Sequence, residues 1–279
     1  MKYIKEIMIL AICLMVLGFS ASVLFGIWCM YQEGVSEYRG LQEFAEEESE
    51  ADADDSGVVK KKTAVDFDSL KEINGDIVAW IKCKELGINY PVVQGTDNSY
   101  YLTHTFSGEE HISGCIFMDC VNKPDFTDDN TILYGHNMKD GSMFGSFSQF
   151  MEETATVFLY TPEGEFIYQI IDDQMVDVSE GKYFRTVYST EDFASLSETI
   201  AAHTGNALVR GEHLLTLSTC NGNANRRHLI LCKEVTETNE KQMEEGTAGE
   251  VIQIEAGQEE TTATAQKGAA KETQEAETK

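Results

Sequence analysis

The feature that most constrains the fold is a short apolar segment that ends in a cysteine. Residues 214–220 read Leu-Leu-Thr-Leu-Ser-Thr-Cys, and the alternation of apolar and small polar side chains is typical of a β-strand. The run 221–225, Asn-Gly-Asn-Ala-Asn, follows at once and predicts a turn. A second apolar strand is expected over residues 229–235. We therefore expect the two strands to pair, with Cys220 held rigidly at a strand end beside a loop that a substrate can reach.

Two other positions can supply chemistry to this thiol. Arg226 and Arg227 follow the loop, so pairing of the two strands brings a guanidinium near Cys220. Residues 131–137 read Thr-Ile-Leu-Tyr-Gly-His-Asn and predict a strand that ends at His136, because the glycine permits a sharp turn. Cysteine, histidine and arginine, each at a strand boundary, match a nucleophile, an acid/base and an oxyanion donor. The remaining histidines lack this context and are expected to be structural: His104, His111, His203, His213 and His228.

The composition argues against several classes of function. The formal net charge is −27, whereas nucleic-acid phosphates require Lys and Arg partners, so no nucleic-acid partner is expected. The sequence contains neither a glycine-rich phosphate loop nor the Cys-x-x-Cys pair typical of zinc sites. We therefore expect no metal and no organic cofactor.

The N-terminal segment predicts a membrane anchor. Residues 7–30 carry no charge and exceed the roughly 20 apolar residues that cross a bilayer. Lys2 and Lys5 precede this run and an acidic stretch follows it, which places residues 1–6 in the cytoplasm and the bulk of the chain outside the cell. The alternative is a cleaved signal peptide with a small-residue site at 20–22, but the apolar run continues past that site. We favour an uncleaved, single-pass anchor over residues 7–31.

Two acidic segments flank one candidate domain. Residues 32–63 combine low hydrophobicity with one charge sign and predict a disordered, extended stalk. Residues 236–279, rich in Glu, Thr, Ala and Gln, predict a second disordered segment, an acidic tail. The intervening residues 64–235 are long enough for one core, at about 100–200 residues per domain.

Short elements are expected throughout this domain. Apolar residues at helical spacing predict one helix over residues 67–73 and another over 191–200, the second capped by Ser189 or Thr190. Many short strands with few helices favour a closed or nearly closed mixed barrel. The strands are expected within residues 77–93, with a bend at 85–87, and at 113–118, 131–134, 157–160 and 165–171.

Several of these stretches together resemble the signature of sortases, most closely class B. The closest matches are Thr-Leu-Ser-Thr-Cys at 216–220, Tyr-Gly-His-Asn at 134–137 and the arginine before the last apolar strand. Each short motif alone is weak, but all of them stand in one chain in the order of the family. Supporting stretches lie at residues 65–74, 88–94, 97–102 and 138–144, so that the resemblance covers residues 65–235.

The resemblance implies a mostly β fold and a set of site residues. The fold would be a mixed eight-stranded β-barrel with a few short helices, including an N-terminal helix and one in the loop before the Cys220 strand, a wall of the substrate groove. Cys220 would be the nucleophile, His136 the acid/base and Arg227, rather than Arg226, the oxyanion or substrate donor. Asn98 and Leu102 would line the groove. Ser218 and Thr219 are candidate hydrogen-bond donors, with packing as the alternative. Some class B members carry an acidic residue just after the cysteine, where this chain has Asn221.

The implied function is that of a Gram-positive cell-wall cysteine transpeptidase, a thiol endopeptidase whose acyl-enzyme is passed to an amine. It would recognise surface proteins with a C-terminal sorting signal of the Asn-Pro-x-Thr-x type, cleave after the threonine and form a thioester on Cys220. The acceptor would be an amine of the peptidoglycan precursor, lipid II. The alternatives are a pilin-polymerising sortase, a cysteine protease that uses water, and a catalytically silent, membrane-anchored module that binds peptides.

Overall fold

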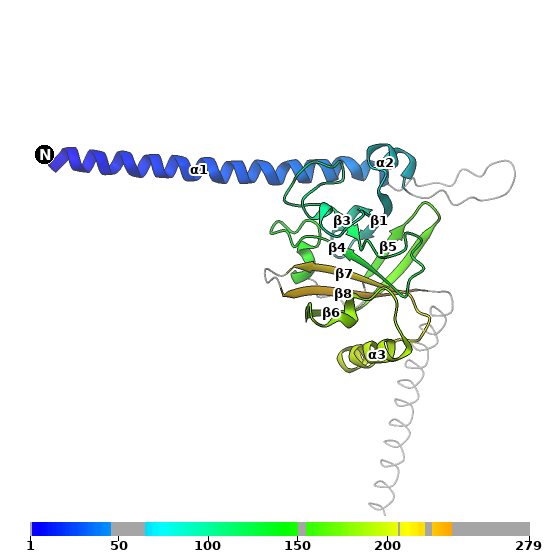
Figure 1. Ribbon diagram of the computed structural model, residues 1–279. Coiled ribbons are helices and arrows are strands. Elements are labelled where there is room, and N and C mark those ends of the chain that lie inside the picture. Colours follow the sequence, from blue (N-terminus) through cyan, green and yellow to red (C-terminus); the bar gives the residue numbers. More distant parts are fainter. Residues whose placement is uncertain (1, 46–64, 150–154, 206, 221–224, 236–279) are drawn as a thin grey trace, which may run out of the picture. The chain divides into compact units, whose positions relative to one another are not determined.

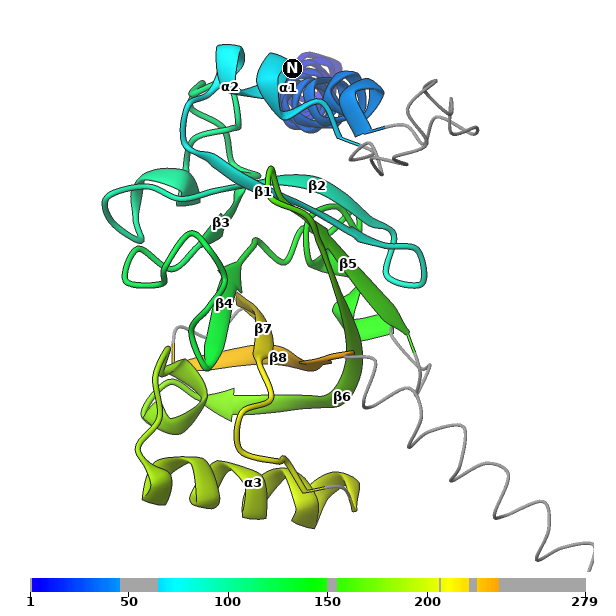
Figure 2. The ribbon, with the colours of Figure 1, turned by 90° about the vertical axis from the view of Figure 1, so that its right-hand side faces the viewer.

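The computed structural model describes residues 2–45, 65–149, 155–205, 207–220 and 225–235 (Figure 1). Eight strands close into one barrel in the order β1-β2-β3-β4-β7-β8-β6-β5 (Figure 2). The pairs β2–β3 and β4–β7 are parallel and the other six are antiparallel. The strands are β1 Ile77–Cys83, β2 Ile88–Val93, β3 Ile116–Met118, β4 Asn130–Tyr134, β5 Thr156–Tyr160, β6 Glu165–Asp177, β7 Leu214–Cys220 and β8 Arg226–Glu234.

Three α-helices and four 3-10 helices accompany the barrel in the described part of the chain. Ser189 caps α3 by accepting a hydrogen bond from the Asp192 amide, and the helix ends at Gly205, whose φ of 81° suits glycine. Asp66 caps α2 in the same way through the Ser69 amide. The helices are α1 Lys2–Leu41, η1 Gln42–Ala45, α2 Phe67–Ile73, η2 Tyr100–Leu102, η3 Gly145–Gln149, η4 Gly181–Phe184 and α3 Thr190–Thr204. The predicted mostly β barrel, with a helix before the Cys220 strand, is confirmed.

Strands β7 and β8 are covered on both faces. Leu215 and Leu217 of β7 belong to the main core inside the barrel. Leu214, one position along, belongs to a second cluster with Phe193 and Leu196 of α3. Successive residues of β8 alternate between the same two clusters. Figure 2 shows α3 outside the barrel on this side. Because both faces of β7 are buried, its polar positions are the small residues Thr216, Ser218 and Thr219, each at most 2% exposed.

Strand β6 runs to Asp177, six residues beyond its predicted end at 171, and two strand starts also differ from the predicted ones. β8 begins at Arg226 rather than at residue 229, so both arginines lie within the ladder instead of before it. β3 comprises only Ile116–Met118, because the residues before it bond to a neighbouring loop, with the Cys115 amide donating to the Tyr101 carbonyl at 2.9 Å. The apolar pattern marks buried residues in both cases but not where the ladder starts.

The prediction of a disordered stalk is wrong for residues 32–45. α1 continues to Leu41, and Gly34, Tyr38, Leu41 and Ala45 form a buried face along one side of the helical segment. The Tyr38 hydroxyl donates to the Gly114 carbonyl at 2.5 Å, and the Gln42 side-chain amide donates to the Asn89 carbonyl at 3.0 Å. The rest of the predicted stalk and the predicted tail at 236–279 lie outside the described residues.

Candidate active site

The backbone pairing of β7 and β8 places Cys220 opposite Arg227. The register matches Cys220 with Arg227 and Thr219 with His228. Directly opposed residues of an antiparallel pair have Cα atoms about 4.5–5.5 Å apart. The side chain of Cys220 lies outside the described residues, so this register is the observation that links the thiol position to the guanidinium.

His136 stands at the same end of the barrel. The parallel pair β4–β7 matches Tyr134 with Ser218, and the Gly135 amide donates to the Ser218 carbonyl at 3.1 Å. His136 therefore follows β4 at the level where Cys220 ends β7. Its Nε2 lies 2.6 Å from the Leu102 carbonyl oxygen, and because a carbonyl only accepts, Nε2 carries the proton. Nδ1 is then the ring nitrogen available for proton transfer.

Gly135 is required for close packing. It is not among the residues with positive φ, so the sharp turn expected here does not depend on a left-handed backbone. A Cβ atom at Gly135 would lie 2.7 Å from Cδ2 of Phe144, a fully buried ring stacked on Phe147. The backbone of the Tyr-Gly-His segment thus packs directly against the buried, stacked rings of Phe144 and Phe147.

We expect Gly135→Ala to lower the free energy of unfolding by about 1–3 kcal/mol, the usual cost of overpacking a core. The shift it forces on His136 should lower kcat/KM tenfold or more, since small misplacements of catalytic groups are costly. Gly164→Ala, at a turn position with nothing within 4 Å of the added Cβ, is the control and should change neither quantity appreciably. Chemical denaturation and peptide-cleavage assays measure the two effects; equal behaviour of both variants would contradict the packing explanation.

Arg226 and Arg227 differ in their surroundings. Arg226 is paired in register with Asp177 of β6, and its Nη2 donates to the Met175 carbonyl at 3.5 Å. Arg227 donates from Nη1 to the Arg226 carbonyl at 3.1 Å. It also acts on Tyr134, whose pKa is raised by burial and by the neighbouring Asp119 and lowered by the Arg227 charge. The preference for Arg227 therefore gains support from its register and from its nearness to β4.

The sequence did not reveal the polar pair that lies near this guanidinium. The Tyr134 hydroxyl donates to Oδ2 of Asp119 at 2.8 Å, and the Val121 amide donates to Oδ1 of the same carboxylate at 3.0 Å. Asp119 is 7% exposed and directly follows β3. The only sign of this pair in the sequence was an aspartate at the end of a strand. Aspartate is also common in turns such as 119–122, so its position did not indicate a site.

The two groove candidates occupy one connection, between β2 and β3. Asn98 is exposed, and its Oδ1 accepts a hydrogen bond from the Cys120 amide at 2.8 Å. Leu102 ends η2 and is 38% exposed, and its carbonyl holds His136. The structure thus connects Leu102 directly to the acid/base candidate and connects Asn98 to the turn that carries Asp119.

Ser218 and Thr219 are almost fully buried, at 1% and 2% exposed. Neither hydroxyl has a hydrogen-bond partner among the described residues. An unpaired buried hydroxyl costs free energy, and this burial is compatible with both roles considered for the two side chains, packing and donation to a ligand. They remain candidate donors next to Cys220.

Three other thiols are poor candidates for the nucleophile. Burial raises the pKa of Cys83 to about 11 and that of Cys115 to about 12, and it also raises the pKa of Cys232. Because the thiolate is the attacking species, these buried groups are unreactive near neutral pH.

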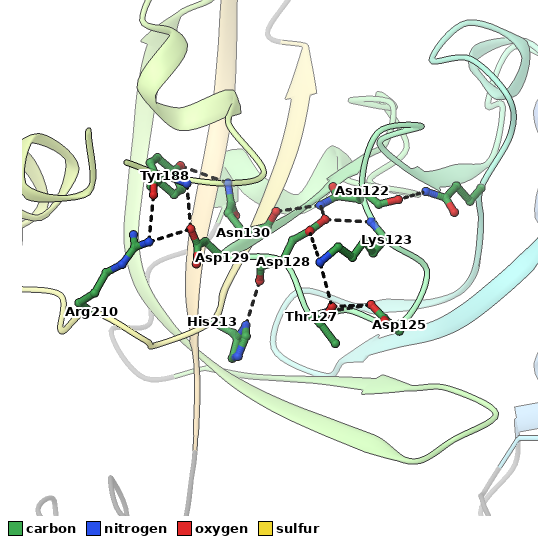
Figure 3. A network of polar contacts seen from close by, with 11 residues as sticks. Asn122, Lys123, Asp125, Thr127, Asp128, Asp129, Asn130, Tyr188, Arg210 and His213 are labelled. Carbon is green, nitrogen blue, oxygen red and sulfur yellow. Dashed lines mark hydrogen bonds and ion pairs between the residues drawn. The ribbon is translucent and has the colours of Figure 1, made fainter. Parts of the chain in front are cut away.

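A polar network fixes the other end of β4. Asn130 donates to the Arg185 carbonyl at 3.0 Å and accepts from the Thr216 hydroxyl at 2.9 Å, which ties β4 to β7. Beside it, the Asp129 carboxylate accepts from the Tyr188 amide and pairs with Arg210 at 3.4 Å (Figure 3). These contacts hold the parallel pair in the register that brings His136 level with Cys220.

Comparison with known proteins defines the class. The sortase domain family matches residues 81–235, more than half of the chain. The chain belongs to the sortase family.

Its relatives place it in class B. It is 34% identical to sortase B of Listeria monocytogenes over 161 residues, which cover 54% of this chain and 65% of that protein, just under two thirds of its length. It is 33% identical to sortase B of Staphylococcus aureus over 164 residues, covering 55% and 67%. The crystal structure of sortase B from Bacillus anthracis in complex with AAEK1 is 29% identical, with a TM-score of 0.61, and the match covers 75% of this chain and all of that one.

Proposed function

We propose that this chain is a cysteine transpeptidase that joins exported proteins to an amine at the cell surface. The observation that carries the proposal is the register that pairs Cys220 with Arg227, with His136 at the same barrel end. Residues 64–235, preceded by the docked helical segment 31–45, form the catalytic domain. Residues 7–30 anchor it in the membrane, with the N-terminus in the cytoplasm and the barrel outside.

The anchor is supported by the character of α1. The segment Tyr3–Ala45 contains an 18-residue window with a mean hydropathy of 2.7, none of which is buried against the rest of the molecule. An apolar helix with no protein partner on it is stable in lipid, where its backbone groups are all bonded within the helix.

In the first half-reaction, the Cys220 thiolate attacks the carbonyl carbon of the threonine in an Asn-Pro-x-Thr-x signal. The carbonyl oxygen becomes an oxyanion, which the Arg227 guanidinium stabilises by charge-assisted hydrogen bonds. The intermediate collapses by breaking the C–N bond, and the leaving amine takes a proton from His136. A thioester on Cys220 and a neutral His136 remain.

In the second half-reaction, an incoming amine attacks the thioester. His136 accepts the proton that this amine loses, the C–S bond breaks and the thiolate of Cys220 is restored. The product is a new amide, and the acceptor is an amine of the peptidoglycan precursor. Asn98, Leu102 and the α3 side of the barrel bind the signal peptide in this proposal, with Ser218 and Thr219 as additional donors.

The full-length chain in detergent micelles, incubated with a panel of sorting-type peptides, tests the proposal. Intact-protein mass should reveal a thioester with one peptide class, and an added primary amine should convert it to a ligated peptide. Release by water alone would favour a protease. Ligation only to a lysine of another protein subunit would favour a pilin-polymerising enzyme. Peptide binding with no adduct would favour the silent binding module.

A further inference from the structure

The strand registers define which loops surround the candidate active site. β3 runs antiparallel to β4, with Phe117 opposite Tyr134, and β4 runs parallel to β7, with Tyr134 beside Ser218. The residues just before β3 are therefore level with His136 and Cys220. The connection over residues 103–115 thus approaches β3 at the same end of the barrel as the candidate catalytic residues.

α1 is docked on this connection by a series of contacts. Tyr38 donates to the carbonyl of Gly114, and the Glu37 carboxylate accepts from the amide and the hydroxyl of Ser107 at 3.0 and 2.9 Å. One turn earlier along the helix, Gly34 packs so closely that an added Cβ would lie 2.6 Å from Cε1 of His111. The helix therefore lies directly against the loop and is not merely tethered to it.

The last of these contacts reaches the end of the apolar segment. Nε2 of His111 lies 2.6 Å from the carbonyl oxygen of Met30, the final residue of the uncharged run 7–30. A helix of that length spans about 36 Å at ~1.5 Å per residue, against about 30 Å for the hydrocarbon core. Met30 consequently belongs at the outer boundary of the bilayer if residues 7–30 cross it.

A second loop of the site contacts the same stretch of helix. Tyr31 and Tyr38 of α1, His111, and Met138 and Asp140 from the segment after His136 line one cavity of about 420 Å³. Both loops beside the candidate acid/base are thus within side-chain reach of α1 just outside the apolar run.

We propose that the barrel end bearing Cys220, His136 and Arg227 faces the outer surface of the bilayer, with the loop 107–113 resting among the lipid headgroups. This inference depends on the proposed anchor. Because α1 is one helix from Lys2 to Leu41 and is docked on the barrel, the anchor fixes the orientation of the domain as well as its attachment. Substrates tethered to the membrane then meet the site directly.

The exposed side chains of the loop suit the headgroup region rather than the hydrocarbon. Ile112 is 44% exposed near the C-terminal end of this loop, whereas its neighbours Glu109 and Glu110 are exposed acids. Carboxylates are repelled by anionic lipids, so the contact comes from the docked helix and from Ile112. We expect it to form equally well on zwitterionic vesicles.

Photo-crosslinking of the full-length chain in phosphatidylcholine vesicles tests the orientation. The photoreactive residue p-benzoylphenylalanine replaces Ile112, Leu17 or Val187 in separate variants, and intact mass detects a covalent phospholipid. Leu17 lies in the apolar run and is 67% exposed; Val187 is 61% exposed and lies beside the start of β4, at the opposite barrel end. The expected result is a lipid adduct at Ile112 and Leu17, and at most a fifth as much at Val187.

The outcomes separate the orientation from the anchor. No lipid adduct at Leu17 would overturn the anchor itself. An adduct at Leu17 with none at Ile112, or with as much at Val187 as at Ile112, would overturn the orientation while the anchor stands. A mass increase equal to a second chain at Ile112 would show a protein contact in place of lipid and would also overturn it.

Undocking the helix provides an independent check. Gly34→Leu forces a side chain into His111 and Ser113. We expect this change, combined with the probe at Ile112, to reduce the lipid adduct at least fivefold while the Leu17 probe reacts as before. Unchanged crosslinking at Ile112 would contradict a fixed orientation, and circular dichroism confirms that the barrel remains folded.

Discussion

Cys220→Ala is expected to abolish formation of the peptide adduct and to lower the rate of peptide cleavage by about 10⁴-fold or more. The reason is that the substitution removes the atom that forms the covalent intermediate, and the other groups of such a site contribute little without their nucleophile. The chain should still fold, because alanine is smaller than cysteine and the backbone pairing of β7 with β8 does not depend on this side chain. The measurement is intact-protein mass together with the rate of release of the C-terminal peptide fragment.

Cys120→Ala is the matched control for this experiment. Cys120 is a partly exposed thiol, and it contacts Asn98 through its backbone amide, which alanine retains. We expect this variant to form the adduct at close to the normal rate. An adduct that survives in Cys220→Ala, or disappears in Cys120→Ala, would assign the nucleophile to another residue.

Arg227→Lys is expected to lower kcat/KM by about 10²-fold, whereas Arg226→Lys should change it by less than about threefold. Lysine keeps the charge but lacks the planar fork of donors, so it stabilises an oxyanion less well. Arg227 is opposite Cys220 in the ladder, while Arg226 is opposite Asp177 of β6. The two variants thus carry the same substitution, with the same charge, in the same strand, and they differ only in position.

Steady-state kinetics with the preferred peptide measures both effects. Thermal unfolding checks that the two variants are equally stable. Equal losses of kcat/KM would mean that the local charge matters rather than the position. A larger loss for Arg226→Lys would reverse the assignment and would require a different register at the end of β7.

The barrel could be predicted because its signals are local. The run 214–220 and the turn after it predict two paired strands, and the spacing of Phe193, Leu196 and Ile200 predicts α3, which the structure confirms. The start of β8 at Arg226 could not be predicted in this way, because the ladder begins before the first apolar side chain of the strand.

The docking of α1 was missed for a different reason. Residues 32–45 are rich in acidic and polar side chains, and such a composition predicts disorder when only averages are considered. The spacing of Gly34, Tyr38, Leu41 and Ala45 carries the signal of one buried helical face. The partners of that face, such as Gly114 and Asn89, lie far away in the sequence. The contact between Tyr134 and Asp119, 15 residues apart, was invisible for the same reason.

The burial of β7 on both faces determines how a site of this kind can change over time. Its side chains contact the barrel core on one face and α3 on the other, so the strand can open to solvent only when a large part of the fold opens with it. A substitution in β7 therefore changes packing in the barrel core and in the α3 cluster at the same time. New peptide preferences therefore have to arise in the loops, such as the segment that carries Asn98 and Leu102, while the position of the thiol is inherited with the fold.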